Sequence, residues 1–233
     1  MGLDISVGSL KYYLIDQDES NDNGNSELIK AQKEEYEQII KVIKENIKQQ
    51  TGQIPEWSEE ESDEYDESTV GIRVGSYHLL HYLRRFAAHI DLDAKPPEPC
   101  RECDPTQDEF LLDIYDGKSV TKFLHLIDHS DCNGYYLPCD FDEPLWIDPE
   151  EFGKSHDDEL VEYLSVGSSI KLKEELLELN KHLNIDLDKS LDDIYSYAEE
   201  IEGTDYEVEK WCLCILYKMC QASINLRLPV IFS

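Results

Sequence analysis

The sequence predicts an α+β fold in which about six helices pack on a small sheet. Apolar residues recur at helical spacing over much of the chain, and they alternate with polar residues in three short segments. Two of those segments lie at the two ends of the chain, so the terminal strands can pair with each other. Because 233 residues are enough to bury a substantial core, we expect one domain over residues 1–233.

The apolar pattern places the elements in order. Residues 3–7 alternate and predict a strand, and residues 12–15 either extend it or return as a hairpin arm. Gly52 ends the predicted helix at 36–47, Val120 faces the core from the short helix at 120–127, and Ser168 caps the helix at 172–183. The other predicted elements are helices at 36–47, 76–91, 120–127, 172–183, 194–201 and 208–219, strands at 70–74 and 228–232, and an edge strand at 135–137.

Two segments lack the pattern of a regular element. Residues 53–69 hold many carboxylates and little apolar surface, and like charges repel, so we expect a mobile acidic loop there. Residues 91–107 contain prolines at 96, 97, 99 and 105, which predicts an irregular loop because proline cannot donate a backbone hydrogen bond.

The composition excludes several functions. The chain carries 52 acidic and 21 basic side chains, a formal net charge of −31. A protein that neutralises the phosphates of nucleic acid, or one that binds an anionic membrane surface, needs the opposite sign, so we expect neither partner. No apolar run is long enough to span a membrane, and no secretion signal precedes the first strand. The odd number of cysteines, seven, suits free thiols, so we expect a cytoplasmic protein.

The surplus of carboxylates is the strongest functional signal. An acidic surface speeds association with a basic protein and disfavours wrong partners, as in immunity proteins against basic nuclease toxins and in DNA-mimicking inhibitors. The sequence therefore predicts a non-enzymatic, immunity- or inhibitor-like protein that binds a basic protein partner; a charge that serves only solubility is the alternative. The candidate partner-binding residues belong to the acidic loop: Glu59, Glu60, Glu61, Asp63, Glu64, Asp66 and Glu67.

A cluster of cations is the second candidate site. His78, His81, Arg85 and His89 share one face of the predicted helix at 76–91, and Arg73 lies on the strand before it. Arginine can make two parallel hydrogen bonds to a carboxylate or phosphate, so this face is a candidate site for a small anion or for an enzyme. The alternative is that these cations pair with the carboxylates of the chain itself.

Two histidines one helical turn apart form the third candidate site. His125 and His129, with Cys132 just beyond them, have the spacing of metal ligands. Cys132 could instead be a nucleophile with His129 as its base, or the block could be a structural turn. The enzyme or small-anion-binding alternative uses either this block or the cationic helix face.

The cysteines suggest one further metal site. Cys100-x-x-Cys103 has the spacing of a zinc-binding pair, and Cys132 and Cys139 could complete a set of four. Six residues lie between the second pair, which is wider than zinc sites usually have. We therefore expect no cofactor, with zinc as the alternative.

Four motifs carry a resemblance to a family. They are the opening MGLDISVG, the block HSDCNGYYLP at 129–138, the run VGSSIKLKEELLEL at 166–179 and the ending LRLPVIFS. Together they resemble a group of uncharacterised bacterial proteins that begin MGLDI, carry a central SDC-Gly block and end in LPxxF. The resemblance implies one family-wide domain in a bacterial cytoplasmic protein, and it implies no activity, cofactor or catalytic residue.

Overall fold

The computed structural model describes residues 3–14, 25–59, 71–131, 134–152, 163–188 and 194–232. Its strands are β1 (Asp4–Val7), β2 (Gly71–Arg73), β3 (Tyr135–Leu137), β4 (Leu145–Ile147), β5 (Leu164–Ser168) and β6 (Val230–Phe232). Its helices are α1 (Leu10–Leu14), α2 (Asn25–Thr51), α3 (His78–Leu92), α4 (Glu109–Tyr115), α5 (Leu124–Ile127), α6 (Ser169–Leu183), α8 (Ile194–Ile201) and α9 (Glu207–Leu226), with 3₁₀ turns η1 (Pro105–Gln107) and η2 (Pro149–Phe152).

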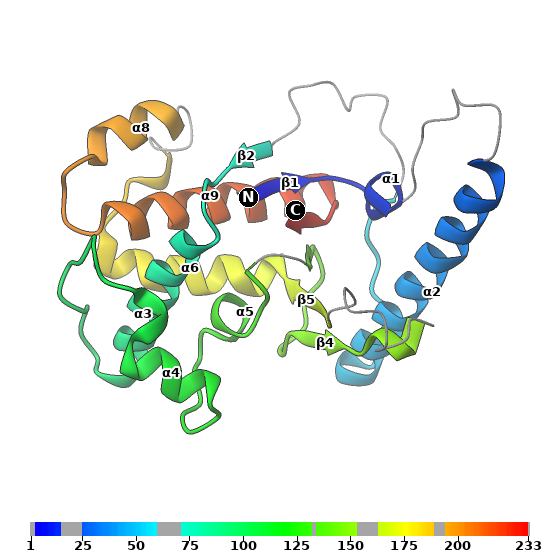
Figure 1. Ribbon diagram of the computed structural model, residues 1–233, viewed down its shortest axis with the longest axis horizontal. Helices are drawn as coiled ribbons and strands as arrows, with labels where there is room; N and C mark the ends of the chain where they lie inside the picture. Colours follow the sequence, from blue (N-terminus) through cyan, green and yellow to red (C-terminus); the bar gives the residue numbers. More distant parts are fainter. Residues whose placement is uncertain are drawn as a thin grey trace.

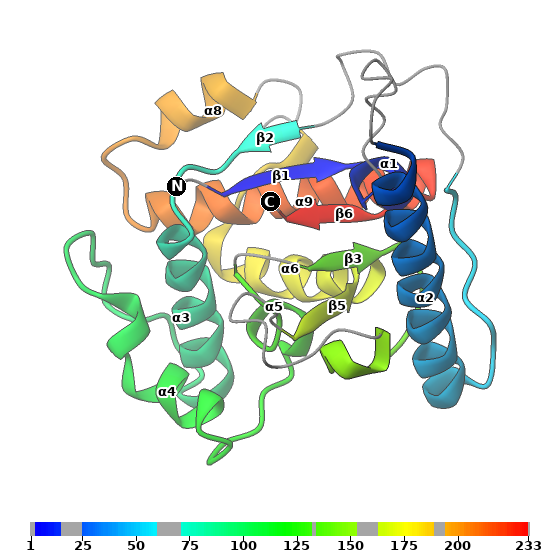
Figure 2. The same cartoon turned by 45° about the vertical axis from the view of Figure 1, so that its right-hand side comes forward.

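The strands of the described residues form one mixed sheet in the order β2-β1-β6-β3-β5-β4 (Figure 2). Ile5 of β1 lies opposite Ile72 of β2 on one side and Phe232 of β6 on the other, both antiparallel. The two ends of the chain therefore pair, as the sequence predicts. Only β3 and β5 run parallel, with Tyr135 opposite Val166.

Both faces of the sheet are covered by helices. Tyr136 and Phe232 belong to an apolar cluster with α3, α5, α6 and α9, whereas Tyr135 and Ile231 belong to a cluster with α2. Figure 1 shows α2 on one side of the strands and α6 and α9 on the other. Because neighbouring side chains on a strand point to opposite faces, every residue of β3 is buried. The predicted α+β class is confirmed.

Tertiary packing overrides the predicted pattern at several places. Residues 10–14 form α1, so the strand or hairpin arm expected at 12–15 is wrong. The strand at 135–137 is present but lies between β6 and β5, so the prediction of an edge position is wrong. Val120 was expected inside but is 85% exposed, because α5 begins only at Leu124.

Three elements were not predicted: α4, β4 and β5. The start of α4 has a local cause, because the Asp108 side chain accepts hydrogen bonds from the main-chain N–H groups of Phe110 and Leu111. β5 is buried on both faces, so it lacks the alternation that marks a half-buried strand. β4 has only three residues, of which Leu145 and Ile147 are buried and Trp146 is exposed, and three residues are too few for a clear pattern. Such strands are identified by the strands with which they pair, and not by the hydrophobic pattern of their own residues.

The two predicted loops are only partly described. Residues 60–69 of the acidic loop lie outside the described residues, and residues 54–59 form no helix or strand. The proline-rich segment is irregular over 93–104, but α3 extends to Leu92 and Pro105–Gln107 form η1. No helix in the described ranges is long and apolar enough to cross a membrane.

Candidate protein-binding surface

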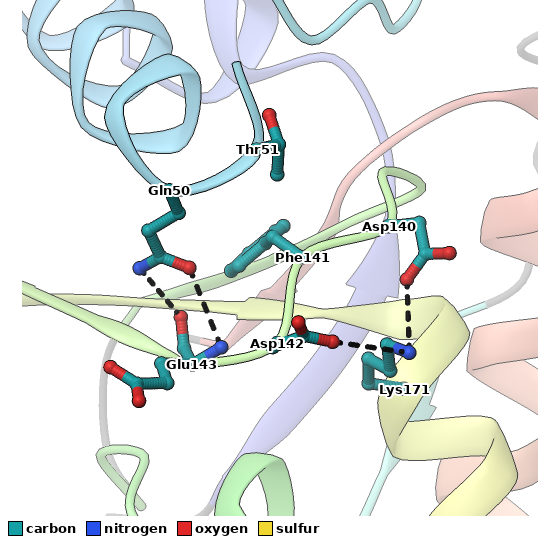
Figure 3. A pocket seen from close by; sticks show the side chains of 7 residues that line it. All are labelled: Gln50, Thr51, Asp140, Phe141, Asp142, Glu143 and Lys171. Atoms are coloured by element: carbon teal, nitrogen blue, oxygen red, sulfur yellow. Dashed lines mark hydrogen bonds and ion pairs between the residues drawn. The ribbon is translucent and has the colours of Figure 1, made fainter. Parts of the chain in front are cut away.

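Three exposed carboxylates surround one lysine where β3 leads into β4. Lys171, in the first turn of α6, has its Nζ 3.2 Å from Asp140 and 3.4 Å from Asp142 (Figure 3). The same Nζ lies 3.7 Å from Glu174. The carboxylate side chains are 66%, 92% and 65% exposed, whereas Lys171 is only 27% exposed. The hydrogen bond to Asp140 raises the pKa of Lys171, so the lysine is charged at neutral pH. One cation for three acids leaves this surface negative.

A pocket lies beside these carboxylates. It measures about 570 Å³ and is lined by the 140–143 loop, by Lys171 and by the end of α2 at Gln50 and Thr51. Figure 3 shows the carboxylates of Asp140 and Asp142 directed toward Lys171 and that of Glu143 directed away from it. We name Asp140, Asp142, Glu143 and Glu174 the acidic rim. An arginine or lysine head group could sit among these four carboxylates.

The side chain of Gln50, at the end of α2, holds the main chain of the acidic-rim loop at Glu143. The Gln50 amide nitrogen donates to the carbonyl oxygen of Glu143 at 3.0 Å, and the Glu143 N–H donates back to the Gln50 amide oxygen at 3.4 Å (Figure 3). This pairing leaves the Glu143 carboxylate free to face solvent. It fixes the loop to a long helix and thus limits the entropy that the loop would lose on binding a partner.

Replacing Gln50 with Glu is expected to lower the free energy of unfolding by about 1–2 kcal/mol. A carboxylate cannot donate to the Glu143 carbonyl oxygen, and it would place a further negative charge beside the acidic rim. Urea unfolding measures the loss. Gln49→Glu adds the same charge at an exposed position on the same helix and is expected to change stability by less than about 0.5 kcal/mol. Equal losses in the two variants would refute the role assigned to Gln50.

His125 holds the same loop from beneath. Its Nδ1 accepts a hydrogen bond from the Ser168 N–H at 3.0 Å, so its Nε2 carries the proton and donates to the Asp142 carbonyl oxygen at 3.2 Å. Burial lowers the pKa of His125 to about 4, so the ring is neutral at neutral pH. Ser168 also accepts from the Lys171 N–H at 3.1 Å and caps α6, as predicted. Both ring nitrogens of His125 are therefore occupied.

A buried arginine fixes the segment after α5. Arg84 of α3 is 4% exposed and donates to the carbonyl oxygens of Leu126 at 2.9 Å, His129 at 2.7 Å and Ser130 at 3.3 Å. Burial lowers the pKa of His129 to about 3, and its ring nitrogens face the carbonyl oxygens of Ser130 and Tyr135. His129 thus belongs to the interior of the fold, whereas Ser130 and Asp131 are half-buried.

The cationic helix face is paired with carboxylates of the chain itself. Asp108 accepts from both Arg85 and His89, and this same carboxylate caps α4. The alternative interpretation of this face, that its cations pair with carboxylates of the chain itself, therefore has a geometric basis. The closest nitrogen–oxygen contacts are Arg73–Asp4 at 3.9 Å, His78–Asp104 at 3.8 Å, His81–Asp131 at 2.7 Å, Arg85–Asp108 at 2.9 Å and His89–Asp108 at 2.8 Å.

Glu59 is the one candidate of the acidic loop that the structure describes. Its carboxylate accepts from the Ser9 hydroxyl at 2.9 Å, from the Lys11 N–H at 3.0 Å and from the Trp57 indole N–H. Glu59 thus binds the start of α1 to the chain that follows α2. The other candidates, Glu60, Glu61, Asp63, Glu64, Asp66 and Glu67, lie outside the described residues.

The metal hypotheses have little support in the described geometry. Among the residues that the structure describes, no group of three or more His, Cys, Asp or Glu side chains is placed to hold a metal ion. Cys139 packs in the cluster with α2, whereas the carbonyl oxygen of Cys103 is bound by Tyr82 of α3. Cys132 lies outside the described residues, so zinc binding by His125, His129 and Cys132 stays a prediction.

Sequence reasoning did not single out the acidic rim. Three carboxylates in the stretch Asp140–Glu143, directly after a strand, are the one local signal. Lys171 and Glu174 are distant in sequence, and they reach this loop because β5 pairs with both β3 and β4 and ends where α6 begins.

Comparison with known proteins gives one match. A family model described as "Putative DNA-mimic protein" matches residues 1–232. No curated protein matches the chain, and no solved structure does.

This match corrects two expectations. The family description names DNA mimicry, and it names neither an immunity or inhibitor role nor an enzyme or small-anion-binding protein, so the predicted function is wrong in both its forms. The partner was expected to be a basic protein, with neither nucleic acid nor a membrane as a partner. That expectation is wrong too, because the family description refers to mimicry of DNA. Net charge alone cannot distinguish these classes.

Proposed function

The chain belongs to this DNA-mimic family, and on that premise we propose that it binds a DNA-binding protein at the surface where that protein binds DNA. The family match over residues 1–232 is the observation that carries the proposal. The net charge of the chain has the same sign as that of DNA, and its magnitude is comparable with that of a short duplex. Duplex DNA carries one charge per about 1.7 Å of axis, so −31 equals the charge on about 50 Å of duplex.

The acidic rim is the part of the described surface that best suits this role. Proteins grip DNA mainly by Lys and Arg side chains placed against phosphates. Asp140, Asp142 and Glu174 offer exposed carboxylates in place of phosphates, and the first two line a pocket that admits a cationic head group. Gln50 and His125 hold the loop in place before a partner arrives, which reduces the entropy lost on binding.

The proposal places the protein in the bacterial cytoplasm, where DNA-binding proteins act. The cysteines at 100, 103, 139, 212, 214 and 220 are free thiols, which suits a reducing compartment.

The test is competition between this protein and DNA. Immobilised protein is exposed to a bacterial lysate, and the captured proteins that also bind duplex DNA are purified. For one such partner, fluorescence anisotropy then measures whether this protein displaces labelled DNA, at low and at high salt. We expect full displacement and an affinity that falls as salt rises, because the contacts are between charges. A partner that binds this protein and DNA simultaneously would overturn the proposal.

A charge-matched pair of variants locates the surface. The variant Asp140→Asn, Asp142→Asn, Glu143→Gln and Glu174→Gln removes the acidic rim and is expected to weaken binding about 30-fold. Four exposed ion pairs at about 0.5 kcal/mol each add to about 2 kcal/mol. The control variant Glu37→Gln, Glu45→Gln, Glu199→Gln and Glu202→Gln removes the same charge from exposed positions on α2, on α8 and just after α8. If both variants lose affinity equally, the acidic rim is not the binding surface, although the DNA-mimic function would stand.

A further inference from the structure

Two cysteines meet in the loop between α3 and η1. The main-chain N–H of Cys103 donates to the sulfur of Cys100, with the nitrogen 2.9 Å from the sulfur. Both residues are partly exposed, and both are free thiols. The loop therefore folds back on itself so that the two residues of the Cys-x-x-Cys motif lie together.

A buried tyrosine supports this loop. The hydroxyl of Tyr82, which is 5% exposed, lies 3.0 Å from the carbonyl oxygen of Arg101 and 2.9 Å from that of Cys103, and it donates to them. Arg101 in turn forms an ion pair with Glu207 at the start of α9, at 2.9 Å. The loop is thus anchored on two helices, which keeps the two sulfurs near each other.

The two thiols differ in character. A hydrogen bond from the Cys103 thiol, together with the nearby Arg85 guanidinium, lowers the pKa of Cys100. Burial raises the pKa of Cys103 to about 11, so Cys103 remains a thiol at neutral pH. The thiolate is the nucleophile in disulfide exchange, so Cys100 reacts first.

Cys100 is also open to small molecules. It lines a pocket of about 460 Å³ between its own loop and the turn that leads into α9. The same pocket is lined by the carboxylates of Glu102, Asp205 and Glu207 and by Arg101. The excess of negative charge favours the approach of a cationic reagent over an anionic one.

We propose that Cys100 and Cys103 form a reversible dithiol–disulfide site that reacts with low-molecular-weight disulfides. The Cys100 thiolate attacks one sulfur of the small disulfide, forms a mixed disulfide and releases one small thiolate. Cys103 then loses its proton and attacks the Cys100 sulfur, which forms the Cys100–Cys103 bond and releases the second small thiolate. Two electrons pass from the cysteine pair to the reagent, which leaves as two thiols. The site is independent of DNA mimicry.

The experiment treats the reduced full-length Cys132→Ser protein with cystamine, a cationic disulfide, or with oxidised glutathione, and maps the products by mass spectrometry. We expect a Cys100–Cys103 disulfide that dithiothreitol reverses. Cystamine is expected to react several-fold faster than oxidised glutathione at low salt, and the difference should shrink at high salt. Failure to form this disulfide, or equal rates at low salt, would overturn the proposal.

Single substitutions separate the two roles. With Cys103→Ser the reaction should stop at a mixed disulfide on Cys100. With Cys100→Ser, modification of Cys103 should be at least tenfold slower than modification of Cys100 in the first variant. Comparable rates in the two variants, or zinc retained by the pair in the untreated protein, would contradict the assignment. Circular dichroism of each variant confirms that the fold is kept.

Discussion

Replacing Gly134 with Ala is expected to lower the free energy of unfolding by about 3 kcal/mol or more. Gly134 has a φ of +101°, which side-chain-bearing residues rarely adopt. An added Cβ would lie 2.3 Å from the Ser165 carbonyl oxygen and 3.2 Å from a ring carbon of His129. Ser165 is held in β5, and His129 is held by its contacts with the carbonyl oxygens of Ser130 and Tyr135. Gly134 cannot move away either, because its own carbonyl oxygen accepts from the Phe232 N–H of β6.

Gly117→Ala is the matched control for this substitution. Gly117 also has a positive φ, +69°, but an added Cβ would meet nothing within 4 Å. Its cost should therefore be the backbone strain alone, about 1 kcal/mol. Urea unfolding of both variants under the same conditions measures the difference. Similar losses would show that the close approach to Ser165 does not constrain Gly134.

The second large effect concerns a buried carboxyl group. Glu209, in the first turn of α9, is 2% exposed, and its Oε1 has no hydrogen-bond partner within the described chain. Burial raises the pKa of Glu209 from 4.5 to about 7. The raised value means that the folded state holds a proton that the unfolded state has lost. The stability that this proton provides is complete below pH 4.5 and is lost as pH rises to about 7.

Glu209→Gln removes this ionisation while keeping the shape of the side chain. The free energy of unfolding of the variant, relative to the native chain, is expected to rise by about 3 kcal/mol between pH 4.5 and pH 8. Denaturant unfolding across this range measures the change. Glu175, whose pKa burial raises to about 8, contributes equally in both proteins and cancels in the difference.

Glu202→Gln is the control for Glu209→Gln, because Glu202 is exposed. The difference between this variant and the native chain should show little dependence on pH. If the difference in free energy of unfolding between Glu209→Gln and the native chain is also independent of pH, Glu209 ionises in the folded protein as it does in the unfolded chain. That result would contradict the burial of Glu209 as a neutral acid.

Part of the candidate surface was predictable, and part was not. The excess of acid, and hence an acidic binding surface, follows from composition. Glu59 was a candidate partner-binding residue, but its carboxylate accepts hydrogen bonds from Ser9 and Lys11. The sequence could not show these two contacts, because they join segments that lie far apart along the chain. His125 has the spacing of a metal ligand, yet its two nitrogens bind the main chain of Ser168 and Asp142.

The sequence by itself determined the long helices α3, α6 and α9, residues 36–47 of α2, a strand near each end of the chain and the sign of the surface charge, because periodicity and net charge are properties of local residues and of composition. Tertiary structure decided the rest. The parallel pairing of β3 with β5 places the 140–143 loop beside Lys171, and packing against both faces buries β3 at the centre of the sheet. These contacts join residues far apart along the chain, and no local pattern encodes which distant segment will cover a given one.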